Sequence, residues 1–401
     1  MKILFVVSSF PALSETFILN QITGFLDAGH DVTILAMSKV DGKVHPDVTS
    51  YNIMEKVVFV NVPKSWGQKF VRATQHFFKN PTRTLQLLNY WRYGKFVFSL
   101  RPLLAEKYLR DQSKYDAIIA HYGSNGLLLS ILEAASTTNR FVFFHGNDLT
   151  GFVTRFGSAI YQPLFKSDIK ILPISRLHAK RVKELGAVKS RVYIHHMGVD
   201  LKKFPPVPLS PCGGGTVQLL LVGRLTEKKG IDIAISSVAN LRAKGYPVEL
   251  TIIGDGDKKQ VLHAQAEALG VKEQIHFIGW LTQTKVDQFI QKASIIIQPS
   301  RVAENGDSEG IPVSLMEALA KGKLVVATYH GGIPEIVEHG YNGLLAVEND
   351  VMALTTSIES MLGMAEVKRQ YMSRNAVQKV ADTFNVVTLN KELMDMCAIK
   401  E

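Results

Sequence analysis

The chain has 401 residues, with 46 Lys and Arg against 36 Asp and Glu, and only two cysteines. This length allows two or three domains, and the ordinary globular composition excludes a disordered or fibrous protein. No apolar run approaches the length of a membrane span, and the two cysteines offer neither a disulfide framework nor metal-ligand spacing, so we expect a protein of the reducing cytoplasm.

The first half of the chain alternates predicted strands with predicted helices. The strands are expected at residues 3–7, 32–36, 57–60, 117–120, 141–144, 169–172 and 192–194. The helices are expected at residues 15–28, 125–135 and 176–185, with an additional helical insertion at residues 65–110. The apolar start is too short for a signal peptide and suits a first buried strand. This alternation predicts a doubly wound parallel sheet.

Positive charge is concentrated in the first half. Residues 1–200 carry 25 Lys and Arg against 14 Asp and Glu, and residues 56–110 carry eleven against one, Glu106. Aromatic residues are interleaved there: Trp66, Phe70, Phe77, Phe78, Tyr90, Trp91, Tyr93, Phe96 and Phe98. Basic side chains with aromatic anchors suit an anionic membrane surface, although a solvated basic face over core aromatics explains the pattern equally well. Nucleic acid is not expected as a partner, because no nucleic-acid fold motif accompanies the charge.

A Pro- and Gly-rich segment at residues 197–215 marks the best domain boundary. It predicts domains at residues 1–205 and 206–383, with a C-terminal helix at about 384–401 that packs back on the first domain. After the boundary, strands are expected at residues 217–222, 249–253, 274–277, 294–297 and 324–327, with helices between them and helical sequence at 352–399. Two doubly wound halves leave a cleft between them, where ligands commonly bind.

The segment at residues 309–320 carries the clearest chemical signal. Glu309 is expected on a loop after a buried strand, and Glu317 inside a helix whose first turn suits Pro312. The free N–H groups at the helix start form an anion site. A carboxylate beside a phosphate cradle is better suited to sugar hydroxyls than to phosphate, because like charges repel. The segment therefore predicts a nucleotide-sugar site.

Two basic residues follow the first strand of the second half. Arg224 can bind a diphosphate with its forked guanidinium, and Lys229 adds a charge just before a helix. The alternative is a surface loop in which Arg224 and Lys229 make ordinary salt bridges. Because the two residues lie in the same predicted domain as residues 309–320, the diphosphate role is favoured. The nearby Asp-Gly-Asp turn at 255–257 suits helix-capping aspartates, and no metal is expected. Gly279, after the next strand, permits close approach of a base.

Polar residues also follow strands of the first half. His145 closes the strand at residues 141–144 and can bond a donor hydroxyl or the departing phosphate, with a structural histidine as the alternative. The candidate acceptor contacts are Ser14, Glu15, Thr16, His121 and Asp148. Ser14 and Glu15 also suit a helix start, so a structural role competes at these positions as well.

Taken together, these segments resemble family-4 retaining glycosyltransferases of the GT-B fold. The resemblance is carried by four motifs: the Glu309/Glu317 pair around Gly310-Ile311-Pro312, Gly223-Arg224 with Lys229-Gly230, His145-Gly146 with Asp148, and Gly198-Val199-Asp200 with Phe204. Residues 9–22 with residues 306–312 look most like the colanic acid and amylovoran exopolysaccharide branch. Many relatives have a Gly-Gly pair in the first strand–helix loop, whereas residues 8–14 of this chain lack it. This departure from the family pattern bears on the geometry of acceptor binding more than on donor binding.

The resemblance implies a role for each matching residue. Glu309 would hold hydroxyls of the donor sugar, and Glu317 would bind the ribose hydroxyls. The backbone at Gly310, Ile311, Pro312 and Val313 would line the sugar and phosphates. Arg224 and Lys229 would neutralise the diphosphate, and His145 would assist near the reacting sugar. The family retains anomeric configuration without a metal cofactor.

The expected protein is therefore an α/β enzyme of GT-B fold, with two Rossmann-like doubly wound domains facing a cleft. It would move a hexose from a nucleotide-diphosphate sugar, UDP favoured over GDP, to a lipid-linked or polysaccharide acceptor in exopolysaccharide biosynthesis. Its expected location is the cytoplasm, peripherally on the inner face of the membrane. The alternatives are a non-catalytic nucleotide-sugar binding protein and a glycoside hydrolase that uses Glu309 and Glu317 as acid and base.

Overall fold

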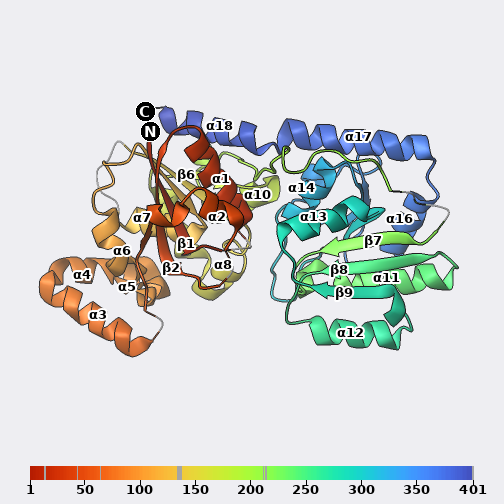
Figure 1. The fold of residues 1–401 in the computed structure, drawn as a ribbon. Helices are drawn as coiled ribbons and strands as arrows, with labels where there is room; N and C mark the ends of the chain where they lie inside the picture. The colour runs from red at the N-terminus through yellow and green to blue at the C-terminus, as the bar shows by residue number, and fades with distance from the viewer. Residues whose placement is uncertain are drawn as a thin grey trace. The chain divides into compact units, whose positions relative to one another are not determined.

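A computed structural model describes residues 1–12, 15–42, 44–63, 65–132, 138–210, 212 and 215–399. The chain forms two compact units. Unit 1 comprises Met1–His196 and Val387–Glu401, and unit 2 comprises Met197–Val386. Each unit contains a parallel six-stranded sheet flanked by helices (Figure 1). The predicted pair of doubly wound, Rossmann-like sheets is thus confirmed.

The sheet of unit 1 has the strand order β3-β2-β1-β4-β5-β6. Its strands are β1 (Lys2–Phe10), β2 (Asp31–Lys39), β3 (Val57–Phe59), β4 (Ala117–His121), β5 (Asn139–Phe144) and β6 (Lys170–Pro173). β1 pairs in parallel with both β2 and β4, as at Phe5 with Ile34 and Ile119. The direction of winding therefore reverses between β1 and β4, and the loops after these two strands flank the switch point, where open α/β sheets bind ligands.

The helices of unit 1 include the predicted insertion between β3 and β4. They are α1 (Thr16–Asp27), α2 (Pro46–Ser50), α3 (Trp66–Lys79), α4 (Pro81–Leu87), α5 (Tyr90–Tyr93), α6 (Arg101–Leu109), α7 (Gly123–Ile131), α8 (Gly151–Phe156), α9 (Gln162–Lys166), α10 (Arg176–Glu184) and α18 (Val386–Ala398). α18 comes from the far end of the chain, and Asn390 donates to the carbonyl of Asn20 at 3.1 Å while the Leu389 carbonyl lies 3.0 Å from His195 Nε2. None of the helices in the described ranges is long and apolar enough to cross a bilayer.

The sheet of unit 2 repeats the same order, β12-β11-β10-β7-β8-β9. Its strands are β7 (Val217–Val222), β8 (Val248–Ile253), β9 (Ile275–Gly279), β10 (Ile295–Gln298), β11 (Leu324–Thr328) and β12 (Leu344–Ala346). Its helices are α11 (Ile231–Ala243), α12 (Lys259–Ala268), α13 (Gln283–Lys292), α14 (Val313–Ala320), α15 (Ile333–Ile336), α16 (Val351–Leu362) and α17 (Glu366–Thr383). Here the switch point lies between β7 and β10.

The central strands are near-continuous apolar runs because helices cover both of their faces. Every residue of β4, β10 and β11 is buried. Their side chains pack against the apolar stripes of the flanking helices, such as Leu127, Leu128 and Leu129 of α7 in unit 1. This packing holds the carboxyl-end loops of neighbouring strands side by side.

Several element predictions were wrong in detail. Residues 192–194 form no strand, and Val192 makes only a single bridge to Ile171. β1 continues to Phe10, since Ser9 and Phe10 still pair with β2. The short strand β12 was not predicted, because three residues carry too little periodicity. The helix predicted at 125–135 begins earlier, at Gly123, and residues 133–137 lie outside the described ranges.

A tight contact joins the loops after β7 and β10 at the switch point of unit 2. Gly230 has a φ of +60°, and a Cβ atom added there would lie 1.9 Å from the carbonyl oxygen of Pro299. Gly245, after α11, also has a positive φ, +85°, but a Cβ atom there would meet nothing within 4 Å. Of these two glycines, therefore, Gly230 combines backbone strain with a backbone clash and Gly245 has the strain alone.

We expect Gly230→Ala to destabilise unit 2 by about 2 kcal/mol more than Gly245→Ala, because left-handed backbone costs both variants about 1–2 kcal/mol but only Gly230→Ala also displaces Pro299. Urea unfolding followed by fluorescence of Trp280 reports on unit 2 when Trp66 and Trp91 are replaced by Phe, since the chain has three tryptophans. Equal destabilisation by the two variants would contradict this close approach.

Candidate functional site

The centre of the site in unit 2 is a buried carboxylate held by two lysines. Glu309, on the loop after β10, is only 8% exposed. Its Oε1 lies 3.5 Å from Lys228 Nζ and its Oε2 lies 3.2 Å from Lys229 Nζ. Lys228 also pairs with Asp307 at 3.0 Å. Both lysines belong to the loop after β7, so these ion pairs join the two loops that flank the switch point.

The surroundings of Glu309 keep it ionised. Burial alone would raise its pKa, but the ammonium groups of Lys229 and Lys228 outweigh burial and hold the pKa below its usual range. The backbone N–H of Glu309 donates to His330 Nε2 at 3.0 Å. His330 therefore carries its proton on Nδ1, which bonds Glu348. The loop after β11 thus fixes the backbone of Glu309 as the lysines fix its side chain.

Glu317 lies in a different environment. It is inside α14, as predicted, and is 5% exposed. Burial raises the pKa of Glu317 to about 7. The hydrogen bond that Gln283 Nε2 donates to Glu317 Oε1 at 2.8 Å lowers this pKa, but by less than burial raises it. Asp287 raises this pKa further. The two glutamates therefore differ in charge near neutral pH, with Glu309 fully ionised and Glu317 close to its midpoint.

The remaining predicted residues of unit 2 border this centre. Arg224 follows β7 and is exposed, with no ion-pair partner among the residues that the structure describes. Gly223 beside it packs against Lys229, since a Cβ there would lie 2.9 Å from Lys229 Cε. Gly279 ends β9 with a φ of +82° and open space around it. The segment that follows Gly279 leads to Gln283, the partner of Glu317.

The loop between Glu309 and α14 is clamped from outside. A Cβ atom on Gly331 would lie 2.1 Å from the Glu309 carbonyl oxygen, and Gly332 donates to the Gly310 carbonyl at 3.0 Å. Gly310 and Ile311 then lead to Pro312, the N-cap of α14, with Val313 as its first residue. The predicted loop and helix placement of this segment is confirmed, and the first N–H groups of α14 are available at its start.

In unit 1, His145 pairs with a second histidine. His121 Nδ1, at the end of β4, lies 3.1 Å from His145 Nε2, just after β5. The His121 ring is fully buried and stacks on Phe143 with ring centroids 5.1 Å apart. Burial lowers the pKa of His121 to about 3 and lowers the pKa of His145 well below its usual range. Because it is completely enclosed, His121 positions His145 instead of contacting an acceptor.

The surroundings of His121 also favour one tautomer of His145. Among the residues that the structure describes, none is a hydrogen-bond partner of the buried His121 Nε2. An orphaned buried N–H is rarer than an orphaned acceptor, so the proton of neutral His121 belongs on Nδ1. His121 then donates to His145 Nε2, and the proton of His145 lies on Nδ1. His145 is thus a neutral hydrogen-bond donor and not a proton acceptor at its free nitrogen.

The other predicted residues of unit 1 are largely engaged by the protein. The Asp148 carboxylate accepts from the backbone N–H groups of Gly123 at 3.0 Å and of Gly146 at 2.8 Å, and also from that of His145. It therefore anchors the turn that carries His145. Glu15 precedes α1, which begins at Thr16, and accepts from the Tyr122 hydroxyl at 2.8 Å. Burial raises the pKa of Glu15. Ser14 lies outside the described residues.

Three residues of this site were missed in the sequence. Lys228 was passed over for its neighbour Lys229, although both follow β7. His330 follows β11 just as His145 follows β5, so the same pattern of a histidine after a buried strand pointed to it. Gln283 carried no signal, because its contact with Glu317 depends on how α13 packs.

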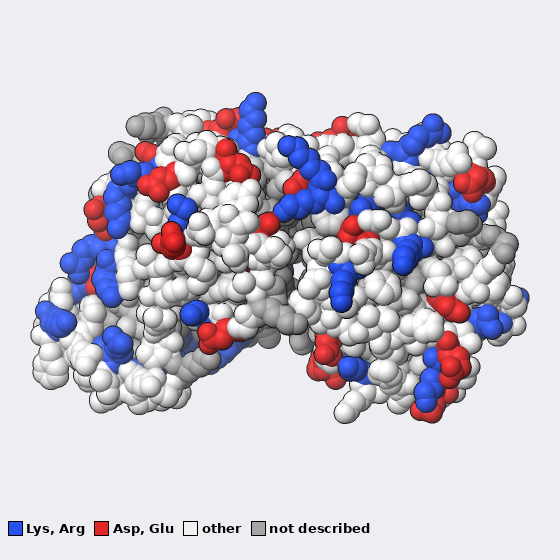
Figure 2. All heavy atoms as spheres, in the orientation of Figure 1, with Lys and Arg blue, Asp and Glu red and all other residues white. Residues whose placement is uncertain are grey.

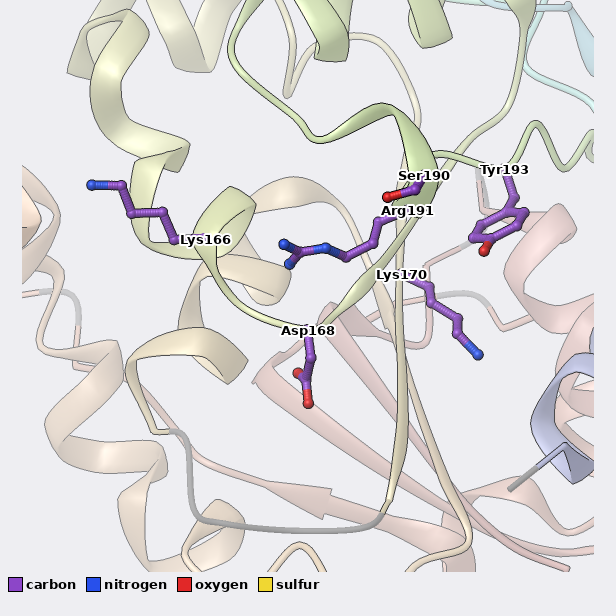
Figure 3. Close-up of a pocket in the computed structure, with 6 residues that line it drawn as sticks. All are labelled: Lys166, Asp168, Lys170, Ser190, Arg191 and Tyr193. Carbon is purple, nitrogen blue, oxygen red and sulfur yellow. The ribbon is translucent and has the colours of Figure 1, made fainter. Parts of the chain in front are cut away.

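A separate surface hollow of about 350 Å³ lies at the end of the unit 1 sheet away from His121 and His145. It is lined by Lys166, Asp168, Lys170, Ser190, Arg191 and Tyr193. Lys170 is the first residue of β6, so the hollow is at the amino edge of the sheet. In Figure 3 the ends of Lys166 and Lys170 point to opposite sides, so the charges do not converge on one ligand.

The tautomer of His145 is measurable. We expect histidine-selective ¹⁵N NMR at neutral pH to show protonated Nδ1 and bare Nε2 on His145, assigned by comparison with His145→Gln. His121→Phe keeps a buried flat ring but removes the donor, so it should release His145 into a tautomer mixture. A wild-type spectrum with His145 protonated on Nε2 would contradict the inferred direction of the His121–His145 hydrogen bond.

Comparisons with known proteins agree with the geometry. The family model "Glycosyl transferases group 1" matches residues 213–379. The chain is 32% identical over 403 residues to the putative colanic acid biosynthesis glycosyltransferase WcaL of Escherichia coli K12, covering 99% of both chains. It is 31% identical over 410 residues to the amylovoran biosynthesis glycosyltransferase AmsK of Erwinia amylovora, again covering 99% of both.

Solved structures share the fold. The crystal structure of Anabaena HepE in complex with UDP-glucose superposes with a TM-score of 0.72 at 19% identity, covering 98% of both chains. WaaG, a glycosyltransferase involved in lipopolysaccharide biosynthesis, superposes with a TM-score of 0.65 at 16% identity, covering 99% of both. The fold is thus that of GT-B glycosyltransferases. With nearly full-length relatives above 30% identity, the chain belongs to the group 1 glycosyltransferases.

Proposed function

We propose that this glycosyltransferase moves a hexose from a nucleotide-diphosphate sugar, with retention of anomeric configuration as in family 4. The observation that carries the proposal is the buried, ionised Glu309 between Lys228 and Lys229, four residues before Val313, the first residue of α14. An ionised carboxylate accepts hydrogen bonds from sugar hydroxyls, whereas the helix start and Arg224 favour phosphate.

The proposed donor contacts divide along the chain. Glu309 accepts from hydroxyls of the transferred sugar, and the backbone from Gly310 to Val313 lines the sugar and the phosphates. Glu317 accepts from the ribose hydroxyls, with Gln283 orienting its carboxylate. Gly279 leaves open space beside β9 for the base. In unit 1, His145 donates from Nδ1 to the sugar or the departing phosphate.

The charges of these residues support transfer without a metal ion. Asp307 and Glu309 balance Lys228 and Lys229, so this cluster is neutral as a whole. Arg224 adds one uncompensated positive charge, and its guanidinium can bind two phosphate oxygens at once. Lys229 retains two N–H donors beyond its bond to Glu309. These groups take the place that a divalent cation occupies in metal-dependent transferases.

The biological setting follows from the full-length relatives. WcaL is named as a putative colanic acid biosynthesis glycosyltransferase and AmsK as an amylovoran biosynthesis glycosyltransferase. We propose exopolysaccharide biosynthesis for this chain, with a lipid-linked or polysaccharide acceptor. We further propose that Glu15, with Thr16, borders the acceptor, and that the enzyme works in the cytoplasm at the inner face of the membrane through residues 56–110. UDP-sugars are proposed over GDP-sugars and are the first donors to test.

One observation favours a second activity. The low pKa of Glu309 and the raised pKa of Glu317 are the contrast expected of an acid and base pair in a glycoside hydrolase. Hydrolysis of an aryl glycoside without any nucleotide would support this activity. Strict dependence of sugar release on a nucleotide-diphosphate sugar would exclude it.

The donor roles of Arg224 and Glu309 predict opposite effects on nucleotide binding. Arg224→Ala should weaken UDP binding roughly tenfold to hundredfold in calorimetry and leave uridine binding unchanged, because one charge-assisted bond is lost. Glu309→Gln should leave UDP binding intact or tighter, since it frees two lysines, while kcat falls roughly tenfold to hundredfold. Equal loss of UDP and uridine in Arg224→Ala, or unimpaired transfer in Glu309→Gln, would overturn these roles.

The raised pKa of Glu317 predicts pH-dependent nucleotide binding. Ribose hydroxyls donate best to the ionised carboxylate, which forms as the pH rises through a pKa of about 7. UDP affinity should therefore increase roughly tenfold from about pH 6 to about pH 8. Glu317→Gln removes this titration but keeps the titration of the diphosphate itself. A pH dependence that is the same in both proteins would refute the assignment of Glu317 to the ribose.

A further inference from the structure

Helix α3 exposes an apolar face to solvent. Trp66, Phe70, Val71, Phe77 and Phe78 are 69%, 71%, 52%, 40% and 85% exposed, and no residue of α3 is buried. We call these five residues the α3 apolar face. Their spacing places them within one half of the helix circumference, so the helix is amphipathic with its apolar side outward.

Helix α3 attaches to unit 1 through the side that carries Ala73 and His76, which begins at one edge of the α3 apolar face because Ala73 is four residues before Phe77. Ala73 packs against the core of the unit. The His76 ring bonds Thr84 at 2.8 Å and Glu106 at 3.0 Å. α3 is thus held through Ala73 and His76, while all five residues of the α3 apolar face remain exposed. Amphipathic surface helices of globular proteins normally turn this face inward, and large exposed apolar patches usually mark an interaction site.

The charge around this face is positive. Lys69, Arg72 and Lys79 lie on α3, which contains no acidic residue. Glu106, the single acid between residues 56 and 110, is 2% exposed and already contacts Arg83 at 2.9 Å and Arg110 at 3.3 Å. It therefore offsets little of the surface charge. Figure 2 shows the region over α3 and α4 as white and blue atoms without a large red patch.

A second exposed aromatic group follows in the same insertion. Trp91 is 96% exposed, and Tyr90 and Phe98 are about half exposed. Tyr90 contacts both rings, with centroids 6.2 Å and 5.8 Å away. The expectation that the aromatics of residues 56–110 lie under a solvated face holds only for Tyr93 and Phe96, which are buried.

We infer that α3 lies in the headgroup region of an anionic bilayer and inserts the α3 apolar face among the acyl chains. This inference rests on the proposed membrane contact and deepens it, because it assigns the contact to aromatic insertion as well as to charge. An in-plane amphipathic helix with aromatic residues on one side and Lys or Arg beside them is the form that such binding takes. A second copy of this chain fits less well, because a symmetric contact would bring two basic surfaces together.

The test uses the full chain and two kinds of vesicle, phosphatidylcholine alone and phosphatidylcholine with phosphatidylglycerol. Co-sedimentation should be strong only with phosphatidylglycerol. Phe70→Ser with Phe78→Ser should lower the partition coefficient roughly tenfold or more. The control, Val261→Ser with Val367→Ser, changes side chains of unit 2 that are 65% and 76% exposed, and should bind like the wild type.

Insertion itself is measured by quenching of Trp66 fluorescence with brominated acyl chains, in a protein with Trp91 and Trp280 replaced by Phe. Quenching supports insertion. Binding of the Phe70/Phe78 variant at wild-type strength, with loss only in Arg72→Gln with Lys79→Gln, would overturn insertion and leave a purely electrostatic contact.

Absence of wild-type binding to either vesicle would overturn both insertion and the membrane contact, while donor binding, measured separately, would still test the transferase site. A wild-type dimer in sedimentation analysis that the Phe70/Phe78 substitutions dissociate would assign the α3 apolar face to a second copy and contradict the inference.

Discussion

The site in unit 2 depends on one constraint, which is that a buried carboxylate must be paired. Glu309 is almost enclosed, and an unpaired charge there would be strongly unfavourable. Lys228 and Lys229 satisfy it from the loop after β7, and His330 satisfies its backbone from the loop after β11. These contacts hold together the three loops that follow β7, β10 and β11. The loops after β7 and β10 approach so closely that only a glycine fits at position 230, beside the carbonyl of Pro299.

The same constraint separates the two glutamates in chemistry. Cationic partners keep Glu309 ionised, whereas Glu317 has an amide partner and a pKa near neutrality. In unit 1, burial and pairing act on histidines. Enclosed His121 fixes the proton of His145, and Asp148 fixes the backbone turn that carries it. In unit 1, the partly exposed His145 is thus held by two buried groups, His121 and Asp148.

The architecture could be predicted from the sequence because, in both halves, short apolar runs typical of buried parallel strands alternate with helical segments. The loop position of Glu309 and the helical position of Glu317 followed from Pro312. Pairing could not be predicted, since the Lys228–Glu309 contact spans two loops and Gln283 reaches Glu317 only through the packing of α13. The exposure of the side chains of α3 could not be predicted from the sequence either. The aromatic pattern of α3 is compatible with a core helix, and only the packing of Ala73 and His76 shows which side faces inward.

The central claim is that Glu309 serves the transferred sugar and Glu317 the ribose of one bound donor. A crystal structure of the protein with a non-transferable UDP-hexose analogue tests it most directly. The account predicts hexose hydroxyls within hydrogen-bond distance of the Glu309 carboxylate, ribose hydroxyls at Glu317, and the diphosphate between Arg224 and the start of α14. A donor whose ribose and hexose contact neither glutamate, or contact them in the reverse order, would contradict it.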